Sequence, residues 1–441
     1  MPSRRRSADG TRSWFAAILL ACLLIPVGPD PLPADDPPEL PSESMAIRLA
    51  DGEEVEPPTG TIAPAGWLIG DNDGTGLNLA WRKGEYTVVP YGIGWLNIAW
   101  DSSRTQTGAF TLYVLSEEIQ GEPSFTVNAR ATRLGVDVTG PKIAGADSSG
   151  RIEFDFFGQA LSENRASVLL RQAYGEFAAE GWRVVGGQTN DVISPLDPHV
   201  LNYSVARGGG NIGYRRPQLR GELFVPLADD MGQMTLQASI SRTVVNDFAS
   251  DPVTGGEDAG WPTVMGRAAL ALGEGETAVI AGLSGHIGEE GVDFGTDPIQ
   301  DDARFLSWSL NLDLTLPASK RFGLRGEFFW GDVLGTFQGG IIQEINPIRR
   351  TGIRSIGGWG EVWFYPTEKW RTHAGLGIDD PYNSDLSDAM RSQNQFYFAN
   401  VVYRFTPLFT VGLEVSWWET RFVGLADGKA LRIETVMQYR F

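Results

Sequence analysis

One segment in the last third of this 441-residue chain alternates between apolar and polar residues at every position, and this period of two most constrains the fold. Leucine or tryptophan occupies every second position from Leu306 to Leu316, and polar residues fill the positions between them. Successive side chains of a β-strand point to opposite faces of the sheet. The segment therefore predicts a strand with one apolar face and one polar face.

Sixteen such segments follow one another, which is an even number. The expected strands span residues 87–101, 124–139, 150–160, 167–177, 182–190, 213–226, 232–245, 262–272, 276–289, 303–317, 321–333, 353–366, 370–379, 394–406, 408–421 and 429–441. The joins alternate between long loops and short turns, as in outer-membrane barrels, where the short turns are periplasmic. If the first strand starts at the periplasmic side, every short turn and both termini of the barrel segment lie there. We therefore predict an all-β fold, a transmembrane antiparallel up-and-down β-barrel of about 16 strands.

The last expected strand supports the membrane assignment. Its thirteen residues, tilted by about 40°, would rise about 33 Å, enough to cross an apolar band of about 25 Å. Leu431, Ile433, Met437 and Tyr439 share one face, and the chain stops on Phe441. A terminal aromatic residue on such a strand resembles the C-terminal signature of bacterial outer-membrane barrels.

The N-terminal part of the chain predicts export. Three arginines at residues 4–6 precede an apolar run at residues 14–28, which is typical of a secretory signal and too short for a transmembrane helix. We expect a signal peptide at residues 1–34, an acidic, proline-rich periplasmic linker at 35–86 and the outer-membrane barrel at 87–441. The single cysteine, Cys22, lies in the expected signal peptide.

Composition narrows the function. With 36 Lys+Arg against 55 Asp+Glu, the formal net charge is −19, which argues against a nucleic-acid partner. Three histidines, and no cysteine after residue 34, leave little material for a metal site, so no cofactor is expected. The expected partners are the lipid bilayer of the outer membrane, small solutes and further copies of the chain.

A barrel of sixteen strands is expected to enclose a water-filled channel lined by the polar face of each strand. Residues 191–212 form a long join that carries its own apolar residues, so we expect this loop to fold into the pore. The residues predicted to line the pore or its constriction are Arg130, Arg133, Arg151, Glu153, Asp155, Arg171, Arg215, Arg216, Arg220, Asp197 and His199. Two interpretations stay open: the arginines form a basic stripe that favours anions, or they pair with neighbouring acids and stiffen the wall.

Six short motifs resemble the DcaP-like outer-membrane porins. In order they are VPYG at 89–92, TRLG at 132–135, EFDF at 153–156, LRQAYG at 170–175, GQT at 187–189 and YRRPQLR at 214–220. The resemblance implies a sixteen-stranded barrel that assembles as a homotrimer and passes small, often anionic, solutes by diffusion. It also implies a third long loop that constricts the pore near Arg171 and Arg216. The proline-rich residues 35–64 differ from the helical N-terminal segment that such porins can carry, which puts trimer formation through that segment in doubt.

The predicted function is that of an outer-membrane porin for passive diffusion of small hydrophilic solutes, anions among them, and not that of an enzyme. One alternative is a non-conducting barrel that acts as a surface adhesin or structural protein. A less favoured alternative is a barrel hydrolase, which would need a nucleophile, a base and an orienting group within reach. The residues near His199, His286 and His373 offer no persuasive serine nucleophile.

Overall fold

The computed structural model describes residues 80–158, 165–244, 259–273, 275–294 and 302–441. The expected signal peptide, most of the expected linker and the loop segments between these ranges lie outside the described residues. The chain divides into two units, residues 1–59 and 60–441, and every described residue belongs to the second. In the described part, no helix has the length and apolar character needed to span a bilayer.

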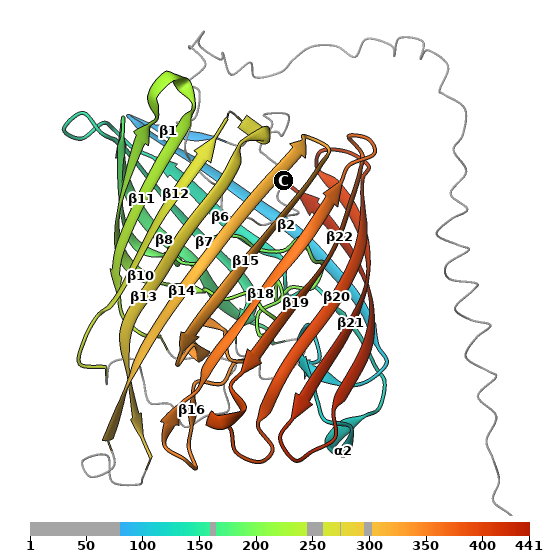
Figure 1. The fold of residues 1–441 in the computed structure, drawn as a ribbon. Helices are drawn as coiled ribbons and strands as arrows, with labels where there is room; N and C mark the ends of the chain where they lie inside the picture. The colour runs from blue at the N-terminus through green and yellow to red at the C-terminus, as the bar shows by residue number, and fades with distance from the viewer. Residues whose placement is uncertain (1–79, 159–164, 245–258, 274, 295–301) are drawn as a thin grey trace, which may run out of the picture. The chain divides into compact units, whose positions relative to one another are not determined.

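Antiparallel strands form one closed barrel wall (Figure 1). The wall strands are β2 (Tyr86–Asp101), β5 (Ser124–Asn128) with β6 (Arg133–Thr139), β7 (Asp147–Gly158), β8 (Ser167–Ala179), β9 (Trp182–Asn190), β10 (Arg215–Pro226), β11 (Gly232–Ser241), β12 (Thr263–Leu272), β13 (Val279–Asp293), β14 (Asp302–Ser319), β15 (Phe322–Asp332), β18 (Arg354–Phe364), β19 (Trp370–Pro381), β20 (Arg391–Arg404), β21 (Phe409–Phe422) and β22 (Gly428–Arg440). Counting β5 and β6 as one interrupted strand, these are the sixteen strands predicted from the sequence. The predicted fold class is confirmed.

The barrel closes where the first wall strand meets the last. Ile98 of β2 pairs with Thr435 of β22 on one side and with Val127 of β5 on the other. The terminal Phe441 takes part in the closure, because its N–H donates to the Gly92 carbonyl at 3.1 Å and its carbonyl accepts from the Gly92 N–H at 2.9 Å. The ring of Phe441 lies over Gly92, where a side chain would collide with it. The last residue therefore completes the seam.

The prediction of one continuous strand over residues 124–139 is wrong in its middle. The ladder stops at Asn128 and resumes at Arg133. A tight turn occupies the gap, in which the Asn128 side chain accepts from the Arg130 N–H and the Thr132 N–H donates to the Ala129 carbonyl. Side chains of this kind compete with a β-ladder for backbone groups, and the period of two does not reveal it.

The two faces of the wall differ as the alternation predicts. On β14, Leu306 and Leu312 are more than half exposed, whereas Ser307 and Asn311 are buried in the interior. The same alternation recurs on β22, where Arg432 and Glu434 lie inside. An apolar outer face around a closed ladder suits a lipid bilayer, because the strands of a closed barrel pair their backbone groups with one another.

Short turns and the C-terminus lie at one end of the barrel, and the long loops lie at the other (Figure 1). The smaller elements are β1 (Trp81–Lys83), β3 (Thr105–Thr107), β4 (Thr111–Val114), α2 (Glu117–Gln120), β16 (Ile345–Asn346), β17 (Thr351–Gly352) and the 3₁₀ turns η1 (Ala228–Asp230), η2 (Gly275–Thr277), η3 (Gly335–Phe337) and η4 (Asn383–Asp385). β1 extends the wall by pairing with the first residues of β2. The alternation of turns and loops agrees with the predicted orientation.

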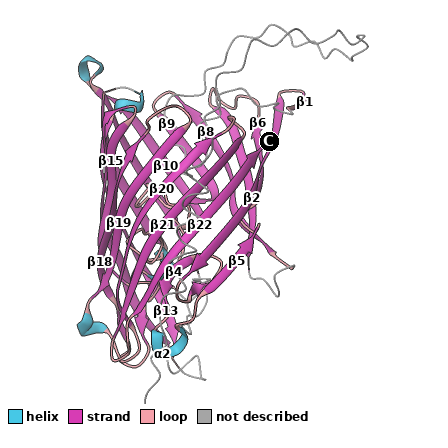
Figure 2. Cartoon of the chain, turned by 90° about the vertical axis from the view of Figure 1, so that its right-hand side faces the viewer, coloured by secondary structure: helices cyan, strands magenta, loops and turns pink. Residues whose placement is uncertain are grey.

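Three loops enter the barrel, whereas the sequence predicted one. We call them the first loop (residues 102–123), the lumen loop (191–214) and the β15–β18 loop (333–353), and Figure 2 shows loop segments behind the strands of the wall. They pack against one another, since the Gly208 N–H donates to the Gln338 carbonyl at 3.0 Å and the Gly213 N–H donates to the Phe337 carbonyl at 2.8 Å. Their apolar residues form buried clusters inside the barrel. The three loops therefore fill much of the barrel interior.

Candidate functional site

A β-bulge on β8 brings two successive side chains into the lumen. Glu153 pairs with Gln172 and Phe154 pairs with Leu170, which leaves Arg171 as an extra residue. Such a bulge re-aims a side chain without ending the strand. Arg171 can therefore reach the carboxylate of Glu153 at 3.2 Å, while Gln172 is buried beside it.

Arg171 is the centre of a charged network beside the lumen loop. Its guanidinium also lies 2.7 Å from the Asp155 carboxylate and donates to the hydroxyl of Tyr203, a lumen-loop residue, at 3.0 Å. The Tyr203 hydroxyl donates in turn to Asp155 at 2.6 Å. Arg133 completes the group at 3.6 Å from Glu153. The predicted residues Arg133, Glu153, Asp155 and Arg171 thus come together, and they tie the wall to the loop.

A second charged group lies on β9 and β10. Arg183 and Arg220 both contact Glu222, at 2.6 Å and 3.0 Å, and Gln237 donates to the same carboxylate at 2.8 Å. Glu176 of β8 lies 3.6 Å from Arg183. Two guanidinium groups therefore share one buried carboxylate, with a second acid at longer range.

A third pair lies nearer the end with the short turns. Arg151 makes a bidentate contact with Asp137, at 2.6 Å and 2.9 Å, and its guanidinium lies over the ring of Tyr91 at 5.4 Å. Arginine on a carboxylate and an aromatic face is held in one orientation by both contacts. This stretch of wall is therefore stiff as well as charged.

Three interior ion pairs place the cation nearer to water than its anionic partner. The pairs are Arg171 with Asp155, Arg183 with Glu222, and Arg325 with Glu361. The arginine side chains are 15%, 15% and 10% exposed, whereas the three carboxylates are 0% exposed. The pair of Arg151 and Asp137 has the opposite order, with side chains 31% and 40% exposed.

The lumen loop is fastened to the wall through its backbone. Glu327 of β15 accepts from the Leu196 N–H at 2.7 Å, and Glu414 of β21 accepts from the Leu201 N–H at 2.6 Å. Between them, Glu361 of β18 accepts from the His199 N–H at 2.7 Å. Backbone N–H groups that donate to a carboxylate form some of the stronger hydrogen bonds. Three separate strands therefore hold the loop in place.

The base of the lumen loop is closed by a buried ion pair. Arg216 is fully buried, and it contacts both oxygens of Asp191, at 2.7 Å and 3.0 Å. It also donates to the Thr336 carbonyl at 3.3 Å, and its guanidinium lies 3.8 Å from the Phe337 ring centre. Arg216 therefore joins two interior loops, and its side chain does not reach the open lumen.

His199 sits in a polar cluster with residues of three wall strands. Its Nδ1 lies 2.5 Å from Glu361 Oε1 and 2.6 Å from Arg325 Nη2, and its ring lies 4.1 Å from that of His373, measured between ring centres. Burial, together with the nearby Arg325 charge, holds the pKa of the His199 imidazole well below its ordinary value.

The remaining predicted residues have different surroundings. Arg130 lies in the turn between β5 and β6, where it donates to the carbonyls of Phe156 and Gly158. The guanidinium of Arg215 lies 4.7 Å from the Tyr214 ring centre. Asp197, in the lumen loop, pairs with Arg207 at 3.1 Å.

The sequence did not identify the wall residues of β15, β18 and β21 that contact the lumen loop. Glu327, Glu361, Glu414 and Arg325 lie on polar faces that were predicted to look inward, but no signal marked them as partners of the lumen loop. A signal did exist for the other two interior loops. Each of them carries several apolar residues, such as Leu112 and Phe337, which is the same feature that placed residues 191–212 in the pore.

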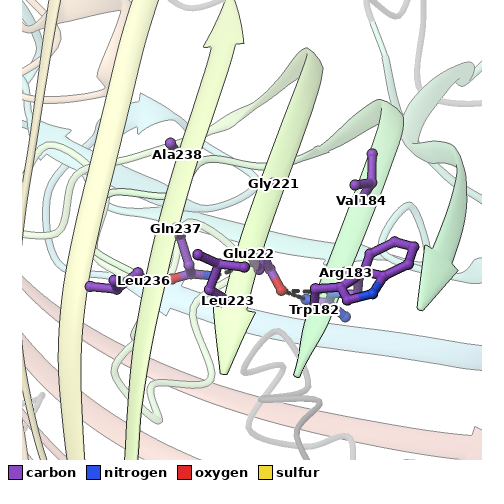
Figure 3. A pocket seen from close by; sticks show the side chains of 9 residues that line it. All are labelled: Trp182, Arg183, Val184, Gly221, Glu222, Leu223, Leu236, Gln237 and Ala238. Atoms are coloured by element: carbon purple, nitrogen blue, oxygen red, sulfur yellow. Dashed lines mark hydrogen bonds and ion pairs between the residues drawn. The ribbon is translucent and has the colours of Figure 1, made fainter. Parts of the chain in front are cut away.

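A hollow of about 480 Å³ lies at β9, β10 and β11 (Figure 3). Gly221 and Ala238 leave space there among larger apolar side chains, including Trp182 and Leu223, which are exposed on the outer face. The hollow therefore belongs to the apolar exterior, and a hydrophilic solute gains little there.

Gly210 provides a test of how tightly the lumen loop is seated. Its φ is +115°, and an added Cβ would collide with the Gly358 carbonyl and lie 2.8 Å from that of Ile378. We expect Gly210→Ala to lower the free energy of unfolding by more than about 2 kcal/mol, from backbone strain and from this contact. Gly145→Ala is the control, because Gly145 has a φ of +86° but open space around it. Equal losses in urea unfolding would contradict the seating of the loop.

Comparison with known proteins agrees with this architecture. No protein-family model matches the sequence, and no curated protein matches it. Among solved structures, the outer-membrane channel DcaP of Acinetobacter baumannii is 16% identical with a TM-score of 0.66, over 82% of this chain and 99% of that one.

Two other outer-membrane barrels are more distant. OprB of Pseudomonas putida is 10% identical with a TM-score of 0.52, over 81% of this chain and 94% of its own. The trimer form of OmpT, an outer-membrane protein of Vibrio cholerae, is 11% identical with a TM-score of 0.50, over 81% and 99% of the two chains. The resemblance stated from the sequence is thus confirmed at the level of the fold, and the chain has the sixteen-stranded barrel fold of the DcaP channel.

Proposed function

We propose that this protein is an outer-membrane porin through which small hydrophilic solutes diffuse passively, with anions favoured. The route runs along the wall formed by β6–β10, past the charged groups of Arg151, Arg171 and Arg183, because the three interior loops fill much of the remaining lumen. No covalent chemistry is required of the wall. Its contribution is electrostatic and steric.

The layering of charge carries the proposal. The guanidinium groups of Arg171 and Arg183 are partly exposed, and their partners Asp155 and Glu222 are fully buried. At short range, an anion is attracted more strongly by the nearer cation than it is repelled by the anion behind it. Beyond about 8–10 Å, salt screens both charges. The preference for anions should therefore be moderate, and it should arise at the narrow part of the route.

The outer surface and the solved structures with this fold support the proposed location and assembly. An apolar exterior on a closed barrel supports insertion in the outer membrane. The trimer form reported for OmpT of Vibrio cholerae supports a homotrimer, as does the resemblance in the sequence motifs. The apolar hollow at β9–β11 and the rest of the exterior are available to lipid or to neighbouring copies.

Single-channel recording of the refolded barrel in a planar bilayer tests the function. We expect stable current steps that come in groups of three, with a conductance below that of a sixteen-stranded barrel without interior loops. Under a salt gradient, the reversal potential should have the sign of anion selectivity. Cation selectivity would contradict the role given to the arginines. A folded barrel with no conductance would contradict the porin and favour the adhesin or structural alternative.

A further inference from the structure

Two of the three histidines in the chain converge inside the barrel, although 174 positions separate them (373 − 199 = 174). His199 comes from the lumen loop and His373 from β19, and Glu361 of β18 lies between them. One possible ligand atom from each of these three residues lies within 4.8 Å of the other two. His199 and Glu361 are already held in place by the hydrogen bond from the His199 N–H to Glu361.

The donor atoms fit a small transition-metal ion. A Zn²⁺ ion binds imidazole nitrogen and carboxylate oxygen at about 2.0–2.2 Å, which places two ligand atoms of a tetrahedral site about 3.4 Å apart. Here Glu361 Oε1 lies 2.5 Å from His199 Nδ1 and 3.8 Å from His373 Nδ1. The two distances bracket the required value, so shifts of less than about 1 Å would bring the three atoms around one ion.

One of the three possible ligand atoms lacks a hydrogen-bond partner among the described residues. His373 Nδ1 is buried and has no hydrogen-bond partner within the described part of the chain, since Glu361 at 3.8 Å is too far away. A buried polar atom without a partner costs free energy, and a bound ion would remove that cost. Two imidazoles and a carboxylate are also the donor set of known zinc sites.

The guanidinium group of Arg325 contacts two of the residues that would bind the ion. Arg325 Nε donates to Glu361 Oε1 at 2.7 Å, and Nη2 lies 2.6 Å from His199 Nδ1. Nη2 also donates to the Asp197 carbonyl at 2.5 Å, which gives Arg325 a second anchor on the lumen loop. An ion that binds Glu361 and His199 must displace part of these contacts. Arg325 therefore competes with the ion for Glu361 and His199, and it weakens the affinity for a metal without removing the ligands.

We propose that His199, Glu361 and His373 form a binding site for a divalent transition-metal ion of the zinc type, which fastens the lumen loop to β18 and β19. The fourth position is left to water. The His199 side chain is 16% exposed, which provides a way in from the lumen. The proposal does not depend on the porin function, since it concerns binding by the folded barrel.

Titration of the folded, full-length barrel in detergent with Co²⁺ tests the site, because Co²⁺ at low coordination number absorbs visible light. We expect saturable absorption bands that one equivalent of Zn²⁺ abolishes. His373→Gln and Glu361→Gln should each weaken binding by about tenfold or more, since each removes a ligand. Arg325→Met should tighten binding by about tenfold, because it removes a positive charge close to the ion.

His286→Gln provides the matched control. His286 is buried in β13 between Ser307 and Ser309, at 2.9 Å and 2.7 Å, and belongs to a different cluster. Each variant is first checked for folding by the heat-dependent shift of its electrophoretic mobility. Binding that survives the loss of His373 and Glu361, or that disappears with His286, would overturn the proposal. Binding by Arg325→Met alone, with none by the native chain, would also overturn it.

Discussion

Arg216→Met is expected to destabilise the barrel by about 3–5 kcal/mol, the usual cost of removing one partner from a buried ion pair. Arg216 and Asp191 are almost completely inaccessible to water, and the methionine side chain would leave the Asp191 carboxylate buried without its counter-charge. Asp191 keeps one bond, from the Tyr214 N–H at 2.8 Å. That bond does not neutralise the charge. The loss is measured by urea unfolding in detergent, followed by tryptophan fluorescence.

The double variant Asp191→Asn/Arg216→Met separates charge from packing. Asparagine removes the unpaired charge and can still accept from the Tyr214 N–H, so the double variant should be more stable than Arg216→Met alone. Arg354→Met is the control. Its partner Asp385 is at 2.8 Å, but Arg354 is well exposed, so the loss should stay within about 1 kcal/mol. Similar losses in both single variants would show that Arg216 does not hold the loops together.

Removing two arginines of the lumen wall is expected to reverse its ion preference. Arg183→Gln/Arg220→Gln leaves Glu222 and Glu176 without their guanidinium partners. Each lost charge changes the energy of an ion about 8 Å away in water by about 0.5 kcal/mol. Loss of both charges therefore raises the energy of an anion by about 1 kcal/mol and lowers that of a cation by about 1 kcal/mol, so the anion-to-cation permeability ratio should fall roughly thirtyfold. The reversal potential under a salt gradient measures this ratio directly.

Arg354, at the barrel end that carries the long loops, offers a matched control for that experiment. Arg354→Gln also removes one guanidinium next to a carboxylate, but the pair lies on the side of the long loops and is exposed to salt. We expect no measurable change in the permeability ratio, because screening is effective there. If the ratio of the double wall variant also stays unchanged, the arginines only stiffen the wall, which is the second interpretation left open by the sequence.

The barrel itself could be predicted because its signal is repeated. Alternation on a single strand such as β14 also fits a soluble sandwich, but sixteen segments with alternating turns and loops fit only a closed barrel. Strand ends were less accurate, because a capping side chain such as that of Asn128 interrupts a ladder without changing the pattern. The bulge at Arg171 was also invisible, since one extra residue shifts the alternation by a single position.

Only the part of the candidate site that lies on β6, β7 and β8 could be predicted from the sequence. Arg133, Glu153, Asp155 and Arg171 share neighbouring strands, so their proximity follows from strand order. The contact of His199 with Glu361 joins residues 162 positions apart, and it depends on the path that a loop takes through the lumen. Periodicity carries no information about such a path.

The three glutamates that hold the lumen loop accept from backbone amides at Leu196, His199 and Leu201, and this choice of partner has a consequence for how the pore can change. Every residue except proline offers an amide N–H, so these three bonds do not depend on which side chain occupies the position. The position of the lumen loop is thus separated from the chemistry of its side chains. Substitutions at exposed positions of the loop can therefore alter the lining of the barrel interior without removing the three anchors.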